Sequence, residues 1–148
     1  MSELLLRPVT ADDLPIFFDQ QTDPDANYMA AFTAKDPTDR AAFMAHWQRI
    51  LADPTVMIRT IVVDGAVVGS VLSYEEDSRP EVSYWLGKPY WGKGIATRAL
   101  AAFLTVDPTR PLYAFVVHRN FGSIRVLQKC GFTIIGSDAE GVTLALNV

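Results

Sequence analysis

The segment WGKGIAT at residues 91–97 follows the apolar run VSYWL at residues 82–86 and precedes the pattern RALAAFL at residues 98–104. The run is typical of a strand and the pattern is typical of a helix, so the glycines between them predict a turn that leads from a strand into a helix N-terminus. Such a turn leaves backbone N–H groups unpaired, lets a ligand come close and places the positive end of a helix dipole beside it. We therefore expect this segment to hold phosphate groups.

The spacing of the glycines excludes the two best-known phosphate loops. A P-loop needs four residues between its glycines, followed by Lys and Ser or Thr, and a dinucleotide-binding fingerprint needs a third glycine. The segment instead resembles the pyrophosphate loop of the GNAT family of N-acetyltransferases, which has Gln or Arg, two residues, Gly, one residue, and Gly or Ala. Trp91, Gly94 and Ala96 occupy these three positions, so the match holds at the small residues and departs at Trp91. The Tyr-Trp pair before the glycines is similar to the branch of ribosomal-protein-alanine acetyltransferases.

A second segment, NFGSIRVLQKCGF at residues 120–132, resembles a later motif of the same family. That motif has Asn, two residues, Ser or Ala, a helix, and then Gly-Phe, and the two motifs come in the family's order. Asn120 can cap the helix with its side-chain oxygen, and Gly131 suits the left-handed position that ends it. For Asn120 the resemblance adds a hydrogen bond to a pantetheine arm, and both roles stay open at this point.

The resemblance implies a GNAT-like α/β (α+β) fold, in which about four helices flank a mixed, mostly antiparallel central sheet of six to seven strands. It also implies acetyl-CoA as the co-substrate and no metal. In the family, the strand that leads to the loop splays away from the neighbouring strand. Its backbone N–H groups are therefore free to hold pantetheine and polarise the thioester carbonyl. The implied cofactor contacts are Trp85, Leu86, Gly87, Trp91, Gly92, Lys93, Gly94, Ile95, Ala96, Thr97 and Asn120. Packing in the core is an equally good interpretation of the Trp85 side chain.

The composition limits the organisation of the chain. Its 148 residues, 49% of them hydrophobic, suffice for one buried core and are too few for two ordinary domains, so we expect a single domain over residues 1–148. No run approaches the roughly 18 apolar residues that span a bilayer, and the first residues lack the pattern of a signal peptide. These features predict a cytoplasmic protein without a membrane partner. The single cysteine, Cys130, excludes an intramolecular disulfide and a multi-cysteine zinc site.

The charge is distributed unevenly along the sequence. The net charge of −4 argues against nonspecific binding of nucleic acid. Residues 1–87 carry 6 Lys and Arg against 14 Asp and Glu, whereas residues 88–148 carry 7 against 3. A basic half suits the phosphates of coenzyme A, and an acidic half suits a cationic acceptor such as an amine or a basic peptide end. The two halves can also interleave in space, in which case the asymmetry averages out.

Period-two patterns, apolar helix faces and turn residues predict the remaining elements. One helix begins at Leu14 with Asp12 or Asp13 as its cap, and Asp23–Asn27 forms irregular chain that in the family borders the acceptor site. A hairpin turns at Asp64–Gly65, and Glu75–Pro80 forms the next turn. The expected strands cover residues 4–9, 57–63, 66–74, 81–86, 111–117, 132–136 and 142–146, and the other helices cover about 38–52, the stretch from the glycine turn to 104, and 120–130.

Transfer of an acetyl group to a primary amine, by direct attack in a ternary complex, needs a base for the amine and an acid for the thiolate. Glu81, which opens the strand that reaches the thioester, is the candidate base, directly or through a water. It can also be an exposed carboxylate at a strand end. His118 has a suitable usual pKa, but its place at a helix entrance favours capping or a coenzyme contact.

The acid is less clearly marked. Many family members have a Tyr four residues before the Gly of Gly-Phe, and Leu127 occupies that position here. Either Ser123 protonates the sulfur or the thiolate leaves without help. The alternative function is a noncatalytic acyl-CoA-binding or sensing module, and an unrelated α/β binding domain is a third interpretation. The expected acceptor is a small-molecule amine or a peptide N-terminus. Because dimers are common in the family, the resemblance also implies a possible homodimer.

Overall fold

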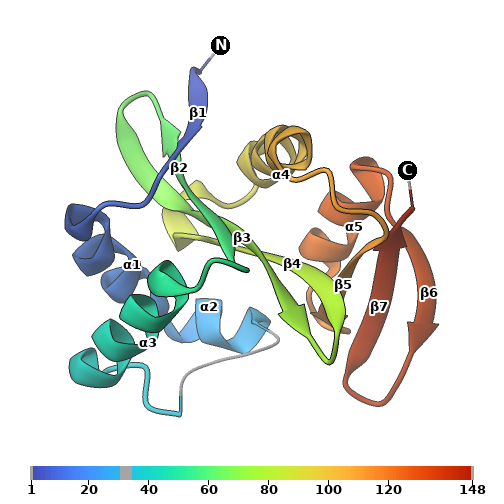
Figure 1. Cartoon of the computed structure of the whole chain (residues 1–148), viewed down its shortest axis with the longest axis horizontal. Helices are drawn as coiled ribbons and strands as arrows, with labels where there is room; N and C mark the ends of the chain where they lie inside the picture. The colour runs from blue at the N-terminus through green and yellow to red at the C-terminus, as the bar shows by residue number, and fades with distance from the viewer. Residues whose placement is uncertain (1, 31–34, 148) are drawn as a thin grey trace.

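A computed structural model describes residues 2–30 and 35–147. The described residues form one seven-stranded sheet in the order β1-β2-β3-β4-β5-β7-β6, in which the β4–β5 pair alone is parallel (Figure 1). The strands are β1 (Leu4–Arg7), β2 (Met57–Val63), β3 (Ala66–Glu76), β4 (Arg79–Leu86), β5 (Leu112–Val117), β6 (Thr133–Ser137) and β7 (Gly141–Leu146). The helices are α1 (Leu14–Gln21), α2 (Pro24–Met29), α3 (Arg40–Ala52), α4 (Ile95–Val106) and α5 (Phe121–Lys129), with short 3₁₀ helices η1 (Ala11–Asp13) and η2 (Lys88–Tyr90). The predicted mixed, mostly antiparallel sheet is confirmed.

Helix α2 corrects the expectation of irregular chain at Asp23–Asn27. The Asp23 carboxylate accepts a hydrogen bond from the backbone N–H of Asp25 at 2.8 Å, and Pro24 is the first helical residue. Asp before Pro marks a turn in a sequence, but the same residues start a helix, because the acidic side chain caps free N–H groups and proline fits the first turn. The described residues therefore contain one α-helix more than the sequence predicted.

The hairpin between β3 and β4 is tighter than predicted. Pairing continues through Glu75–Pro80 and Glu76–Arg79, so these residues belong to strands and the six-residue turn was wrong. Asp77 and Ser78 form the turn with φ of 52° and 63°. Two left-handed residues in a row match the right-handed twist of the strands, and Asp tolerates this conformation better than most residues.

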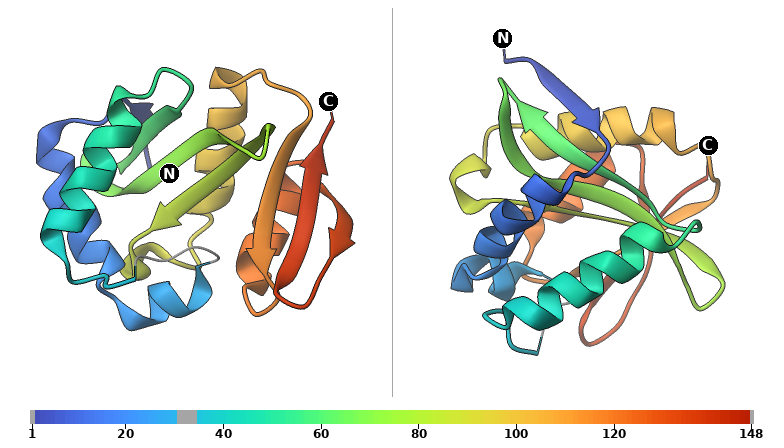
Figure 2. Two further views of the ribbon diagram at one scale, coloured as in Figure 1. Left: turned by 60° about the horizontal axis from the view of Figure 1, so that its bottom comes forward. Right: turned by 60° about the vertical axis from the view of Figure 1, so that its left-hand side comes forward.

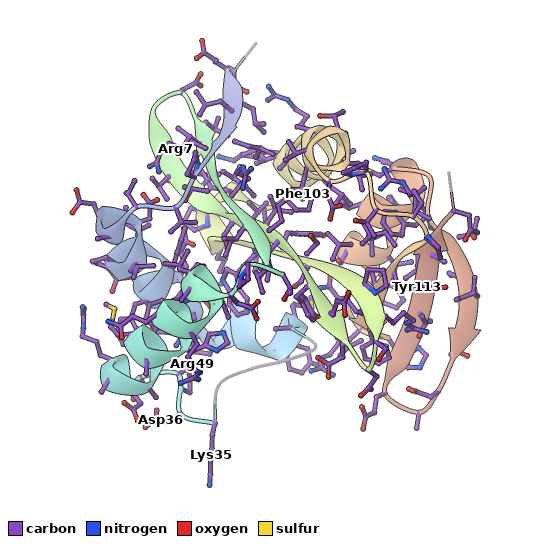
Figure 3. All side chains as sticks on the ribbon, viewed as in Figure 1. Arg7, Lys35, Asp36, Arg49, Phe103 and Tyr113 are labelled. Atoms are coloured by element: carbon purple, nitrogen blue, oxygen red, sulfur yellow. The ribbon has the colours of Figure 1, made fainter. Side chains whose placement is uncertain are left out.

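The sheet is covered on both faces (Figures 1 and 2). Helices α4 and α5 pack on one face, where the core contains the fully buried Phe103 (Figure 3). Helices α1 and α3 cover the other face through an aromatic cluster in which the Phe17 and Trp47 rings stack at 5.0 Å between centroids. No helix among the described residues is both long and apolar enough to cross a bilayer.

Strands β4 and β5 diverge, as the resemblance to the GNAT family implied for the strand before the glycine turn. Among the described residues, Glu81 and Tyr113 form the only registered pair between these strands, and this pair lies near the start of both. From there to Leu86 and Val117 the sheet has no ladder between them. The fold therefore opens a gap in the middle of its own sheet.

Candidate functional site

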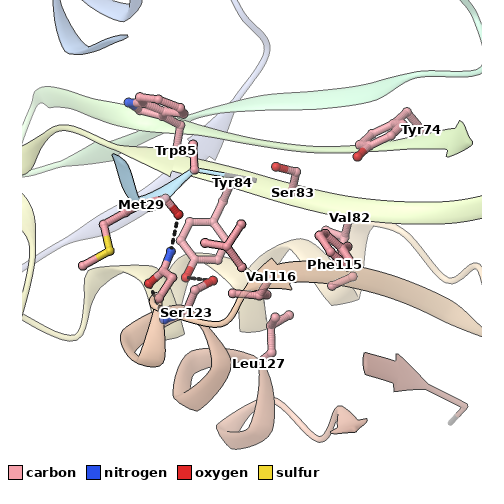
Figure 4. Close-up of a pocket in the computed structure, with 14 residues that line it drawn as sticks. Met29, Tyr74, Val82, Ser83, Tyr84, Trp85, Phe115, Val116, Ser123 and Leu127 are labelled. Atoms are coloured by element: carbon pink, nitrogen blue, oxygen red, sulfur yellow. Dashed lines mark hydrogen bonds between the residues drawn. The ribbon is translucent and has the colours of Figure 1, made fainter. Parts of the chain in front are cut away.

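The gap between β4 and β5 leads into a cavity of about 540 Å³. Its walls come from α2, the end of β4, the glycine turn, the first turn of α4 and one side of α5 along its length. A second cavity of about 100 Å³ continues it between the strands and shares Met29, Ala30, Tyr84, Trp85, Asn120 and Ser123 with it (Figure 4). The two cavities adjoin each other at these shared residues, and together they are called the cleft.

Most of the residues singled out in the sequence meet in this cleft. The larger cavity is lined by Trp85, Leu86, Trp91, Gly92, Gly94, Ile95, Ala96, Thr97, Asn120 and Ser123. Gly87, Lys93 and Glu81 line neither cavity. The structure thus brings the two motifs together across the gap, although about 25 residues separate them in the chain.

The glycine turn presents backbone donors to the larger cavity. Gly92 and Gly94 have φ of 72° and 77°, and a Cβ on either would meet no atom within 4 Å, so the backbone conformation and not crowding requires glycine. Gly94 is the N-cap of α4, and the first bond of the helix runs from Arg98 N to Gly94 O at 3.2 Å. The N–H groups of Ile95, Ala96 and Thr97 therefore lack acceptors within the helix, which makes this end of α4 suited to an anion.

Backbone alternation decides which amides of β4 face the gap. The Gly87 N–H donates to Val68 O at 2.9 Å, so it is not free, contrary to expectation. In an antiparallel pair, alternate residues point their N–H and C=O groups at the same neighbour. The N–H of Trp85 therefore faces β3, whereas that of Leu86 faces the gap. Of the three residues expected to offer free amides, Leu86 alone does so.

Trp91, which stands where the family pattern has Gln or Arg, has a structural role that the sequence did not indicate. Its indole Nε1 donates a hydrogen bond to the Leu86 carbonyl at 2.9 Å. This bond ties the glycine turn to the end of β4. The residue that replaces Gln or Arg of the motif thus fixes the position of the loop that follows it.

Asn120 caps α5 and also reaches α2. Its Oδ1 accepts from the Ser123 backbone N–H at 3.1 Å, and its Nδ2 donates to the Met29 carbonyl at 3.0 Å (Figure 4). The capping role is therefore confirmed. The bond to Met29 could not be predicted, because the sequence did not indicate that α2 lies over the start of α5.

Helix α2 is attached to both sides of the cleft. On the β4 side, Asp25 forms an ion pair with Lys88 of η2. On the β5 side, Arg119 donates to the Tyr28 carbonyl and stacks its guanidinium 4.3 Å from the Tyr28 ring centroid. Because Ala26 and Met29 line the larger cavity, α2 forms part of its wall.

Two basic residues that the sequence analysis did not select line the larger cavity. Arg125 and Lys129 lie four residues apart on α5, so they share one face of the helix. Their i, i+4 spacing was the available signal, but the sequence did not show which helix face meets the glycine turn. The predicted Lys93 is exposed instead.

A pair of hydroxyl groups lies where the two cavities meet. The Tyr84 hydroxyl, from β4, donates to Ser123 Oγ, from α5, at 2.9 Å (Figure 4). Burial raises the pKa of the Tyr84 phenol, although the hydrogen bond with Ser123 acts in the opposite direction. The sequence analysis did not select Tyr84, because its side chain faces the gap only where β5 diverges from β4. The sequence does not show the position of that divergence.

Glu81 is buried beside the narrow end of the cleft. Its side chain accepts from Arg79 Nε at 3.1 Å, and the residue is 7% exposed, so the alternative of an exposed strand-end carboxylate is wrong. Glu81 pairs in register with Tyr74 of β3, which lines the smaller cavity. Burial, together with the charges of Glu81 and Glu76, raises the pKa of Tyr74 to about 12.

The structure places His118 away from the cleft. Its Nε2 lies 2.7 Å from the Asp138 carbonyl in the turn between β6 and β7, and it lines neither cavity. The helix cap is Asn120, so the capping role expected of His118 was wrong, while the alternative of a coenzyme contact stays a prediction. In the described part of the chain, no three His, Cys, Asp or Glu side chains gather as a metal site.

Comparisons with known proteins agree with this geometry. Residues 3–133 match the family model of the acetyltransferase (GNAT) domain. A Bacillus subtilis (strain 168) protein named "Putative ribosomal N-acetyltransferase YdaF" is 30% identical over 81 residues, which are 50% of this chain and 44% of that protein. The matched region thus spans less than half of the relative.

Solved structures share the fold at low sequence identity. Aminoglycoside acetyltransferase AAC(6')-Ib in complex with ribostamycin and coenzyme A has a TM-score of 0.82 at 18% identity, over 98% of this chain and 93% of that chain. The microcin C7 self-immunity acetyltransferase MccE in complex with acetyl-CoA and AMP has a TM-score of 0.78 at 17% identity, over 99% and 93%. The family model covers most of the sequence and includes the glycine turn and α5. The chain therefore belongs to the GNAT acetyltransferase domain family.

Proposed function

We propose that this protein is an N-acetyltransferase that transfers the acetyl group of acetyl-CoA to a primary amine by direct attack in a ternary complex. The observation that carries the proposal is the cleft between β4 and β5, which ends at the free N–H groups of the first turn of α4. Related folds hold coenzyme A or acetyl-CoA. The first turn of α4 suits the pyrophosphate of the coenzyme, because it offers backbone N–H donors and the positive end of a helix dipole.

The residues of the cleft suit the parts of the coenzyme. In the proposal, the N–H groups of Ile95, Ala96 and Thr97 hold the pyrophosphate, and Arg125 and Lys129 add positive charge beside it. The Leu86 N–H, which faces the gap, binds the pantetheine arm or polarises the thioester carbonyl. Gly92, Gly94 and Trp91 hold the loop in the conformation that exposes these donors.

Glu81 is the proposed base and Ser123 the proposed acid. The amine nitrogen forms a bond to the acetyl carbon, the C–S bond breaks, and its electron pair stays on sulfur. Glu81 takes the amine proton, through a water where it does not reach the amine directly, because it lies beside the smaller cavity and not in its wall. Ser123 lines both cavities, which suits a donor to the sulfur.

The acceptor is proposed to carry a cationic amine, either as a small molecule or as a peptide N-terminus. Tyr74 lines the smaller cavity, and the negative charges of the Glu81 and Glu76 carboxylates are near enough to raise its pKa. Arg79 pairs with Glu81, so the Glu76 carboxylate leaves negative charge at this end of the cleft, which favours a cation. One of the related structures holds ribostamycin.

A noncatalytic acyl-CoA-binding module is the second candidate, and the apolar Leu127 at the family's tyrosine position favours it. Release of free coenzyme A from acetyl-CoA, measured with a thiol reagent against a panel of amines and basic peptides, separates the two. An acetyltransferase releases coenzyme A with at least one acceptor and forms its acetylated product in equal amount. Binding of acetyl-CoA without release across the panel would favour the noncatalytic module.

A further inference from the structure

The hydroxyl pair of Tyr84 and Ser123 occupies the junction of the two cavities. Both residues line the larger cavity, where the proposal places the coenzyme, and both line the smaller one, where it places the acceptor amine. The thioester must lie between its coenzyme and the amine that attacks it. The hydroxyl pair therefore lies where the C–S bond has to break.

The direction of the hydrogen bond leaves one proton available. Tyr84 donates to Ser123 Oγ, so the serine accepts with a lone pair and its own O–H is free to donate elsewhere. Around the pair, Val82, Val116 and Leu127 form apolar walls of the smaller cavity (Figure 4). A hydroxyl donor in such surroundings interacts more strongly with a developing negative charge than it would in water.

We propose that Tyr84 is a positioning residue that supplies a proton to the departing coenzyme A thiolate through Ser123. This inference rests on the proposed acetyl transfer. A tyrosine from β4 thereby takes over the task for which α5 lacks a tyrosine at Leu127, and Ser123 makes the contact with sulfur.

The proton transfers balance. As the C–S bond breaks and its electron pair moves to sulfur, the Ser123 proton passes to sulfur and the Tyr84 proton passes to the Ser123 oxygen. The tyrosinate then takes a proton from solvent, which balances the amine proton that the base returns to solvent. Because a phenol is a weaker acid than a thiol, the tyrosinate is short-lived.

The first test compares Tyr84→Phe, Ser123→Ala and the double variant with the wild type in steady-state acetyl transfer. Tyr84→Phe keeps the ring that packs in the core and removes one oxygen. Each single variant is expected to lower kcat about 100-fold, in the range of lost acid catalysis, while the Kd for acetyl-CoA, measured by calorimetry, changes little. Because two groups in one relay fail together, the double variant should be no slower than the slower single variant.

A fluorinated tyrosine at position 84 provides a conservative rescue. It keeps the ring and the hydroxyl but lowers the phenol pKa, so the high-pH limb of the kcat profile should move to lower pH while activity at neutral pH stays near the wild-type level. A role of Tyr84 in packing alone would leave the high-pH limb in place.

Unchanged kcat in Tyr84→Phe, or losses that multiply in the double variant, would overturn the relay and leave the acetyl transfer intact. A wild type that releases no coenzyme A would overturn both.

Discussion

At the scale of single residues, Asp13 shows how the fold uses a buried charge. Arg7 donates to both carboxylate oxygens at 2.8 Å, and the Thr10 N–H and the Thr60 hydroxyl donate at 2.9 and 2.7 Å. Asp13 is the N-cap residue of α1, as one of the two predicted alternatives had it, but its side chain makes no capping hydrogen bond there. The carboxylate instead accepts from residues of β1, the start of η1 and β2. The reason is tertiary, because Arg7 and Thr60 pair in register on neighbouring strands.

The Asp13 carboxyl makes stability depend on pH. Burial acts to raise its pKa, but the hydrogen bonds from Arg7, Thr10 and Thr60 outweigh burial and lower the pKa to about 2. A folded pKa below the unfolded value of about 3.9 contributes stability above pH 4 that is lost as the pH falls toward 2, about 2 to 3 kcal/mol in total.

Urea unfolding of the wild type and Asp13→Asn between pH 2 and pH 7 measures this contribution. The wild type should be more stable at pH 7, and the difference between the two proteins should shrink below pH 4 as the wild-type carboxylate takes up a proton. A difference that stays constant over this range would show that the Asp13 charge does not stabilise the fold.

At the scale of elements, the first turn of α4 connects local structure with ligand binding. Ala96→Asp places a negative charge at the helix N-terminus, where the dipole favours it, so the fold should keep its stability. The same charge repels a phosphate, so the Kd for acetyl-CoA should rise at least tenfold by calorimetry.

Ala101→Asp is the matched control for that variant. Ala101 lies on the exposed side of the same helix, outside both cavities, and its replacement should leave the Kd unchanged. Equal affinity in Ala96→Asp and the wild type would contradict the assignment of the phosphate site to this turn.

Asn120 joins two elements, and its two roles can be separated. Asn120→Ala loses both the cap of α5 and the bond to Met29, whereas Asn120→Asp keeps an oxygen that can cap. We expect Asn120→Ala to lower the free energy of unfolding by about 1 kcal/mol and Asn120→Asp to change it little. Hydrogen exchange of the amides in residues 25–29 should be faster in both. Exchange that stays at the wild-type rate in Asn120→Asp would show that the side chain does not hold α2.

At the scale of the whole molecule, the strands along the chain and the two motifs were predictable, whereas the order of the strands in the sheet and the walls of the cleft were not. Period-two patterns and turn residues such as Asp64 and Gly65 define strands locally, and glycine spacing defines the phosphate turn. The place of Tyr84 depends on where β4 and β5 part, and that of Arg125 depends on how α5 packs against α4. These are relations between distant segments, which local patterns do not contain.

The charge asymmetry of the sequence has a spatial counterpart along the cleft. Arg125 and Lys129 line the larger cavity, whereas the carboxylates of Glu81 and Glu76 lie near Tyr74, which lines the smaller one. The halves also interleave, since Asp25 of α2 pairs with Lys88 on the β4 side of the cleft. The folded molecule thus separates charge within the site while it mixes charge at the surface of α2.

Thermal unfolding with and without acetyl-CoA tests the central claim, that the opened sheet is a coenzyme site, most directly. A ligand at 100 times its Kd adds about 2.7 kcal/mol to the stability of the folded state. We therefore predict a rise in Tm of several degrees with acetyl-CoA and no such rise with adenosine at the same concentration. A folded protein whose Tm does not move with acetyl-CoA would contradict the claim.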